Sequence, residues 1–399
     1  MQKSRKTTEN SNSAPESSSA GLLDRLGNGL TAEEEATQER LFAHEYKKSL
    51  LRSRAAFAVI LALLVFTFII SFGTGRYAVA PAEVIASIWS GIKHGLWWIG
   101  SMLGLQSTEP PFLTGSEDTV IWLVRMPRIT AAILVGAALS VSGATYQGLF
   151  RNPMVSPDIL GASAGASVGA CLMMLFDQGD VMIQAAAFIM GIFAVALSYF
   201  LSKTIGRGNN MVLLLVLCGM TVNTLFQAFV SIIKYLADTE SQLPEMTYWL
   251  MGSLAKVRYE DLAFFMIPFA IGVIPIMMLR WKLNVLSFGE DEARAMGVNV
   301  TYVRVICIIC ATLLTAAVVS IAGTIGWVGL MIPHLVRFII GPNNKTLIPL
   351  SLFTGALFML VVDDFCRALL AYEIPLGVLT SLLGAPFFIF ILFRRKGAA

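Results

Sequence analysis

The stretch AAFAVILALLVFTFIISFG, residues 55–73, carries no charged residue and decides the fold class. A second stretch, DLAFFMIPFAIGVIPIMMLR at 261–280, is apolar over nearly its whole length. A helix needs about 20 apolar residues to cross a hydrocarbon core of ~30 Å, and backbone groups in lipid must bond within their own segment. Because both stretches are apolar on every side, they differ from the alternating strands of a membrane barrel. They predict an all-α, multi-pass membrane helix bundle.

The composition of the whole chain agrees with these two stretches. Of 399 residues, 56% are hydrophobic and 14% are charged, and the mean hydropathy is +0.71, which excludes a water-soluble globule. The net charge of +3 is small and the basic residues lie between apolar runs, so no nucleic-acid partner is indicated. Cys307 and Cys310 form an isolated C-x-x-C inside an apolar run. We interpret all five cysteines as packing residues and expect neither a metal nor a cofactor in this chain.

Ten membrane spans are predicted along the chain. An even number of spans places both termini on one side of the membrane. The segments assigned to that side carry more Lys and Arg than the opposite segments, so both termini are predicted to be cytoplasmic. The predicted spans are 55–73, 126–147, 158–176, 183–202, 211–233, 261–280, 302–322, 327–341, 346–362 and 377–393.

The remaining segments define the domain organisation. Residues 1–45 are polar and Ser-rich and are predicted to form a disordered tail, although Thr31 and Glu34 fit a capping box that opens a helix leading to the first span. A transmembrane domain is predicted over 46–396. It includes a long extracytoplasmic loop at 74–124, in which IKHGLWWIGSMLGL is too short to cross and is predicted to lie in the membrane interface.

The stretch RNPMVSPDILGASAGASVGA, residues 151–170, allows two interpretations. Its glycines recur every fourth residue, which predicts one helix face for close packing by Gly161, Gly165 and Gly169. GASAG also fits the G-x-S-x-G nucleophile pattern, so an intramembrane serine protease using Ser163 and His334 is the alternative. Packing is favoured, because the strand-to-helix turn of that pattern has no place in an all-helical chain.

An energy source cannot be found within the chain. There is no G-x-x-x-x-G-K-[ST] phosphate loop, and the histidines His44, His94 and His334 lie far apart, without His or Cys partners at metal-ligand spacing. Charges within the spans, which would indicate an ion relay, are nearly absent. Asp363, Asp364 and Arg367 lie at a predicted outer helix end, either solvated or paired locally. By contrast, the cytoplasmic segment 283–304 has an acidic helix start and a glycine break, which predicts a short helix that docks another protein.

Four segments together carry a family resemblance: RMPRITAAILVGAALSVSGATYQGLFRNPMVSPDILGASAGASVGA, FGEDEARAMGVNV, GTIGWVGLMIPHLVR and EIPLGVLTSLLGAPFFIFIL. They resemble the permease subunits of ABC importers for ferric siderophores, haem and vitamin B12, over roughly residues 75–396. The resemblance implies a non-enzymatic homodimer in a prokaryotic plasma membrane. Its implied partners are two cytoplasmic ATPase subunits that bind the ATP and an extracytoplasmic substrate-binding protein. Its implied cargo is a ferric siderophore, with haem or cobalamin as alternatives.

The resemblance also assigns roles to residues at matching positions. It implies docking of the binding protein, coupling to the ATPases through the segment 283–301, and a cytoplasmic gate. The polar tail and the expansion at 91–118 exceed the usual family length and receive no role. The implied docking residues are Arg125, Arg128 and Arg367; the coupling residues are Gly289, Glu290, Ala293 and Gly297; the gate residues are Gln147, Asn152 and Pro153.

Overall fold

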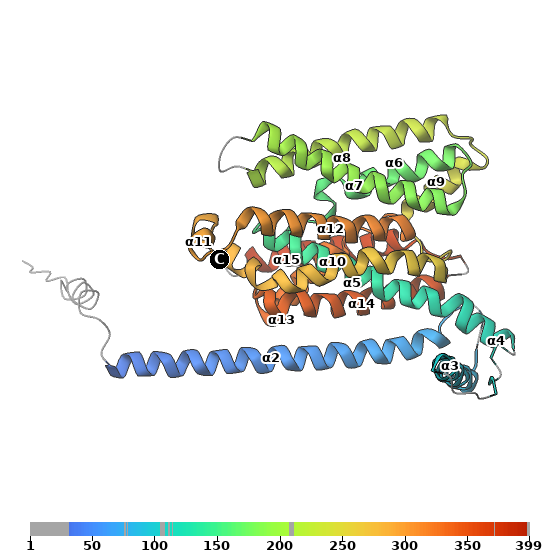
Figure 1. The fold of residues 1–399 in the computed structure, drawn as a ribbon, viewed down its shortest axis with the longest axis horizontal. Helices are drawn as coiled ribbons and strands as arrows, with labels where there is room; N and C mark the ends of the chain where they lie inside the picture. The colour runs from blue at the N-terminus through green and yellow to red at the C-terminus, as the bar shows by residue number, and fades with distance from the viewer. Residues whose placement is uncertain are drawn as a thin grey trace, which may run out of the picture. The chain divides into compact units, whose positions relative to one another are not determined.

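A computed structural model describes residues 32–75, 77, 79–103, 108–110, 112–113, 115–206, 211–370 and 372–396. These residues form helices and turns and include no strand, which confirms the all-α prediction. The chain divides into two units, residues 1–54 and 55–399, and the description below concerns the second unit. Its helix bundle is shown in Figure 1.

The described elements follow one another along the chain as helices of very different lengths. They are α2 (Ala32–Gly73), α3 (Pro81–Met102), α4 (Ser116–Thr119), the π-helix η1 (Val120–Arg125), α5 (Met126–Leu149), the 3₁₀ turn η2 (Pro157–Leu160), α6 (Ala162–Leu175), α7 (Asp180–Ile205), α8 (Met211–Leu236), α9 (Gln242–Met251), α10 (Tyr259–Leu286), α11 (Glu290–Ala295), α12 (Val300–Ala322), α13 (Val328–Ile340), α14 (Asn344–Ala368) and α15 (Leu376–Lys396).

Seven helices in the described part are long and apolar enough to cross a membrane. Three shorter apolar helices lie at Ala162–Leu175, Val328–Ile340 and Leu376–Ile391. Together these helices account for the ten predicted segments. The short helix α11 lies at one end of the bundle, and α3 and α4 lie at the other (Figure 1). These are called the α11 end and the α3 end below.

Helix α5 lies at the centre of the bundle and packs against α10, α12, α13 and α14. Small residues allow two of these helices to approach closely. A Cβ atom added to Gly136 would lie 2.1 Å from the carbonyl oxygen of Gly355 in α14, and one added to Gly143 would lie 1.8 Å from that of Gly329 in α13. Such contacts bring helix backbones together and supply dispersion energy that lipid cannot replace.

The third predicted span begins later than expected. Pro157 opens η2, and Gly161 then takes a left-handed conformation with φ +86°, so α6 starts only at Ala162. Gly161 therefore does not share the packing face predicted for the three glycines. A Cβ atom on Gly165 or Gly169 would lie 2.4 or 2.3 Å from a carbonyl oxygen of α7. With 14 residues, α6 is about 21 Å long at 1.5 Å per residue.

Two boundaries differ from the sequence-based predictions. Residues 32–45 lie within the predicted tail of 1–45 but belong to α2, as the helix predicted from the capping box requires, while residues 1–31 with Thr31 lie outside the described residues. The segment 74–124, predicted as a loop, contains the 22-residue helix α3, which begins at Pro81 with Glu83 accepting a hydrogen bond from the Ala80 amide at 2.9 Å. Proline and an acidic residue suit the first helical turn.

Helix α3 runs across the direction of the long helices, so Figure 1 shows it end-on. Trp122 of η1 holds one face of it, donating a hydrogen bond to the Ser87 carbonyl at 3.3 Å and lying against Gly91. The interfacial position expected for the Trp-containing segment stays a prediction. Exposed large apolar side chains of α3 are Ile85, Trp89, Ile92, Leu96, Trp98, Ile99 and Met102.

Candidate functional site

The α3 end carries a network of buried ion pairs that begins at Arg128. Its Nε donates to Oδ1 of Asp363 at 2.9 Å, and its Nη1 lies 3.0 Å from both carboxylate oxygens of Glu373. Arg128 is 7% exposed and Asp363 is fully buried. Because a planar guanidinium group can bond two carboxylates at once, Arg128 ties α5 to both α14 and the segment that follows it.

Arg367 extends the same network toward α2. Its Nε lies 3.0 Å from Oδ2 of Asp363, and the two groups form an ion pair without a hydrogen bond between these atoms. Its Nη1 donates to the Thr74 carbonyl at 3.1 Å, and its Nη2 pairs with Asp364. Ser71 in turn donates to Asp364 at 2.6 Å. Asp363 and Asp364 are thus paired locally rather than solvated.

Arg125 completes the set of three arginines predicted for docking. It donates to the backbone carbonyls of Phe72 and Tyr77 and is 4% exposed. The structure brings Arg125, Arg128 and Arg367 to one end of the bundle, but it buries them against acceptors of their own chain. Sequence reasoning missed Glu373, although its place shortly after the predicted ninth span was a usable signal.

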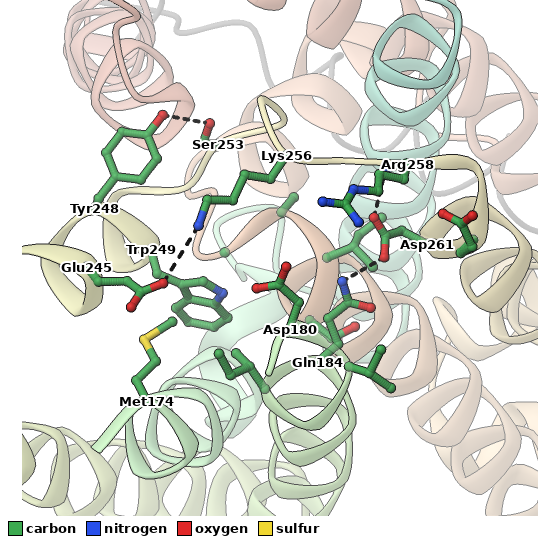
Figure 2. Close-up of a pocket in the computed structure, with 17 residues that line it drawn as sticks. Met174, Asp180, Gln184, Glu245, Tyr248, Trp249, Ser253, Lys256, Arg258 and Asp261 are labelled. Carbon is green, nitrogen blue, oxygen red and sulfur yellow. Dashed lines mark hydrogen bonds and ion pairs between the residues drawn. The ribbon is translucent and has the colours of Figure 1, made fainter. Parts of the chain in front are cut away.

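A cavity of about 240 Å³ opens near the ends of α7, α9, α10 and α12. Charged side chains of both signs line it (Figure 2). Lys256 reaches toward Glu245, with 3.6 Å between Nζ and Oε1, and Gln184 donates to Asp261 at 2.7 Å. The Arg258 amide also donates to Asp261, at 2.8 Å. Most of these polar groups satisfy one another, so the cavity offers mixed charge rather than a metal-binding set.

The segment predicted to couple to the ATPases forms a short helix with defined ends at the α11 end. Gly289, at φ +140°, precedes α11, and Gly297, at φ +78°, follows it. The Gly297 amide donates to the Arg294 carbonyl and the Val298 amide to the Ala293 carbonyl, both at 2.9 Å. These bonds close the helix in the manner of a glycine C-cap, for which the positive φ is required.

Glu290 attaches α11 to the bundle. One of its carboxylate oxygens pairs with Arg304 of α12, which is 5% exposed, and the other lies 3.3 Å from Arg294. Ala293 is fully buried and belongs to the core of the bundle. Ala293 therefore faces its own chain, and a bulky residue there would disturb this packing before it met any partner.

Two residues beside α11 are placed more suitably for a partner. Phe288, which precedes the helix in the sequence, is 68% exposed, and Met296, which follows it, is 60% exposed. Sequence reasoning missed both, although two large apolar residues within an otherwise charged loop were a usable signal. Exposed aromatic and methionine side chains are the types enriched at protein interfaces.

Of the predicted gate residues, Gln147 lies in the last turn of α5, and Asn152 and Pro153 lie in the segment between α5 and η2. Gln147 is 2% exposed; its Nε2 donates to the Leu330 carbonyl at 3.1 Å, and its Oε1 accepts from Arg337 at 3.1 Å. Asn152 accepts from the Met154 amide at 3.0 Å and precedes Pro153. Gln147 therefore ties the end of α5 to α13.

The residues of the protease alternative are engaged elsewhere. Ser163 lies in the first turn of α6, and its hydroxyl donates to Asp158. The ring of His334 lies 5.1 Å from that of Phe338. No strand precedes Ser163 among the described residues, so the strand-to-helix turn of a nucleophile elbow is not formed here.

Residues 63–394 match the FecCD transport family over more than three quarters of the chain. The chain belongs to the FecCD transport family. It is a multi-pass permease component of an ABC importer, which carries out transport and is not an enzyme. The protease alternative is therefore wrong.

Several relatives and one solved structure resemble the chain over most of its length. The molybdate import permease of Haemophilus influenzae is 38% identical over 334 residues, covering 84% of this chain and 94% of the relative. An iron chelatin permease of Helicobacter pylori is 37% identical, covering 71% and 85%. The hemin permease of Yersinia pestis is 37% identical, covering 71% and 86%. An inward-facing structure of a metal-chelate type ABC transporter shares 36% identity and a TM-score of 0.72, covering 86% and 99%.

Proposed function

We propose that two copies of this chain form the membrane path of an importer for a metal chelate, and that this chelate is a ferric siderophore. The α11 end faces the cytoplasm, with both termini, and receives two ATPase subunits. The α3 end receives an extracytoplasmic binding protein. The membrane is the plasma membrane of a prokaryote. The observation that carries this proposal is that potential docking elements lie at opposite ends of a bundle that belongs to an import family.

The ATPase contact is proposed from the shape of α11 and its surroundings. The helix is fixed at both ends by glycines and held by the Glu290 to Arg304 pair, so a force on it reaches α12 directly. Phe288 and Met296 project beside it. Apolar side chains on a rigid support suit insertion into a cleft of a partner that closes when ATP binds.

The binding-protein contact is proposed at the arginine network. The side chain of Glu373 is 26% exposed and is the most accessible of the network's carboxylates. We propose that Glu373 occupies the place of a partner carboxylate on Arg128 until the binding protein arrives. An exchange of one carboxylate for another keeps the buried guanidinium paired throughout, which avoids an uncompensated charge.

The cargo proposal rests on the chemistry named for several relatives. An iron chelatin, haemin and cobalamin are the cargoes named for permeases at 36–37% identity. The molybdate permease of Haemophilus influenzae, at 38% identity over 94% of its length, makes molybdate a second candidate. The two classes differ in size and in charge, so one uptake experiment separates them.

The experiment reconstitutes the permease with its cognate ATPase and binding protein in liposomes. ATP-dependent uptake of a ferric siderophore is compared with that of haemin, cobalamin and molybdate. The proposal expects accumulation of the ferric chelate only when the ATPase and binding protein are both present. If only molybdate is taken up, molybdate and not a ferric chelate is the cargo. Uphill uptake without the ATPase would overturn the assignment as a component of an ATP-driven importer.

A further inference from the structure

A second cavity, of about 580 Å³, lies where several helices end within the bundle. Its walls come from the η2 and α6 junction, the end of α9, the segment after α12 and the start of α15. Asp158 is the only ionisable residue among the described residues that line it. A carboxylate at a break between helices of a membrane bundle is unusual, since ionisable groups at such depth are rare and mark pathways.

The hydroxyl groups around this cavity all use their protons within the protein. Ser163 donates to Asp158, Thr324 donates to the Leu250 carbonyl, and Ser381 donates to the Gly377 carbonyl at 2.6 Å. Each hydroxyl is left with lone pairs only. The polar side chains therefore offer acceptors and one carboxylate to a molecule in the cavity, and donors come only from backbone amides such as those of the non-helical segment 324–326.

This arrangement selects among the candidate cargoes. Sites for tetrahedral oxyanions commonly combine N–H groups with the positive charge of Arg or Lys, and no Arg or Lys is among the described residues that line this cavity. A neutral or cationic chelate with N–H or O–H groups on its surface can donate to Asp158, Thr324 and Ser381. When Asp158 is ionised, its charge adds attraction for cations and repulsion for anions.

We infer that the cavity at Asp158 is a cargo subsite that admits neutral or cationic chelates bearing hydrogen-bond donors and disfavours oxyanions such as molybdate. The inference rests on the proposed function and names the charge class of its cargo. It also assigns Asp158 a role in specificity beyond accepting the hydrogen bond from the Ser163 hydroxyl.

The charge of the cavity can be measured without any cargo. Ser381, which is exposed on the cavity wall, is changed to Cys, and its labelling by a cationic and an anionic methanethiosulfonate reagent is compared with that of 2-mercaptoethanol in solution. The five native cysteines are buried, and the chain without the change gives the background. We expect the cationic reagent to be favoured at Ser381→Cys by about fivefold or more.

Three further variants assign this preference to the carboxylate. Adding Asp158→Asn should remove most of the preference, and adding Asp158→Glu should keep it. Asp238→Asn is the matched control, because it removes an exposed carboxylate that does not line the cavity. Equal labelling by both reagents at Ser381→Cys overturns the inference even if Asp158→Asn does not fold. The inference is also overturned if Asp238→Asn removes as much of the preference for the cationic reagent as Asp158→Asn does.

Uptake measurements then test whether the subsite at Asp158 acts on the transported chelate. In the reconstituted importer, Asp158→Asn should lower uptake of a neutral hydroxamate chelate of iron severalfold, while Asp238→Asn should leave it unchanged. If the wild-type importer moves no ferric chelate, the proposed function fails, whereas the labelling ratio still decides the charge of the cavity. Unchanged uptake by Asp158→Asn would overturn the subsite.

Discussion

Both ends of the bundle carry ion pairs between arginines and acidic residues, but these pairs serve different purposes at the two ends. At the α3 end, Arg128 and Asp363 are nearly or fully buried and join segments 235 residues apart in the sequence. At the α11 end, Arg294 pairs with Glu290 and Asp291 within one short helix and is 54% exposed. The first arrangement braces the fold, and the second leaves the helix free to meet a partner. Burial and sequence separation, rather than residue type, distinguish ion pairs that brace the fold from solvated local pairs, and within the brace only the partly exposed Glu373 is proposed to meet a partner.

The largest effect is expected at the centre of the brace. Asp363→Ala leaves Arg128 and Arg367 buried without their shared carboxylate, so it should lower the free energy of unfolding by about 3–5 kcal/mol. Unfolding of the purified protein in mixed detergent micelles measures this. The exposed pair of Lys256 and Glu245 supplies the control, since Glu245→Ala should change stability by less than about 1 kcal/mol. Equal losses for the two variants would refute the distinction between the two kinds of pair.

At the α11 end, removal of apolar side chains should affect binding and leave the fold unchanged. Phe288→Ala combined with Met296→Ala should weaken association with the ATPase at least tenfold, which corresponds to about 1.4 kcal/mol. A binding titration with the cognate ATPase measures it. Ala293→Leu is the informative comparison, because that buried position should lower stability instead. Tight ATPase binding by the double variant would exclude these two side chains as anchors.

The sequence predicted the spans and the short helix α11 well, because both depend on local patterns. Apolar length identifies a span, and an acidic helix start between two glycines identifies α11. The burial of the arginines was not predictable in this way, since Glu373 meets Arg128 across 245 residues. The start of α6 was missed because Ser156 and Pro157 resemble a helix start, whereas the chain forms a 3₁₀ turn and continues through left-handed Gly161.

A smaller effect is expected from releasing the accessible carboxylate of the brace. Glu373→Gln keeps the size of the side chain but removes its charge, so Arg128 becomes more attractive to a carboxylate of the binding protein. Affinity for the cognate binding protein should rise about threefold, and the gain should shrink with added salt. Surface plasmon resonance of the permease in nanodiscs measures both. A weaker complex would show that Glu373 itself takes part in docking.

The smallest effect is expected at the exposed pair of the α11 end. Arg294→Ala removes contacts of 3.0 and 3.3 Å to Asp291 and Glu290, yet such pairs are screened by water and contribute less than about 0.5 kcal/mol. Glu290 keeps its bond to Arg304, so α11 should remain attached to the bundle and ATPase binding should change little. Unfolding and binding titrations of Arg294→Ala beside wild type test this. A loss as large as that of Asp363→Ala would mean that exposure does not separate the two ends, because a solvated local pair would then stabilise the fold as much as a buried distant one.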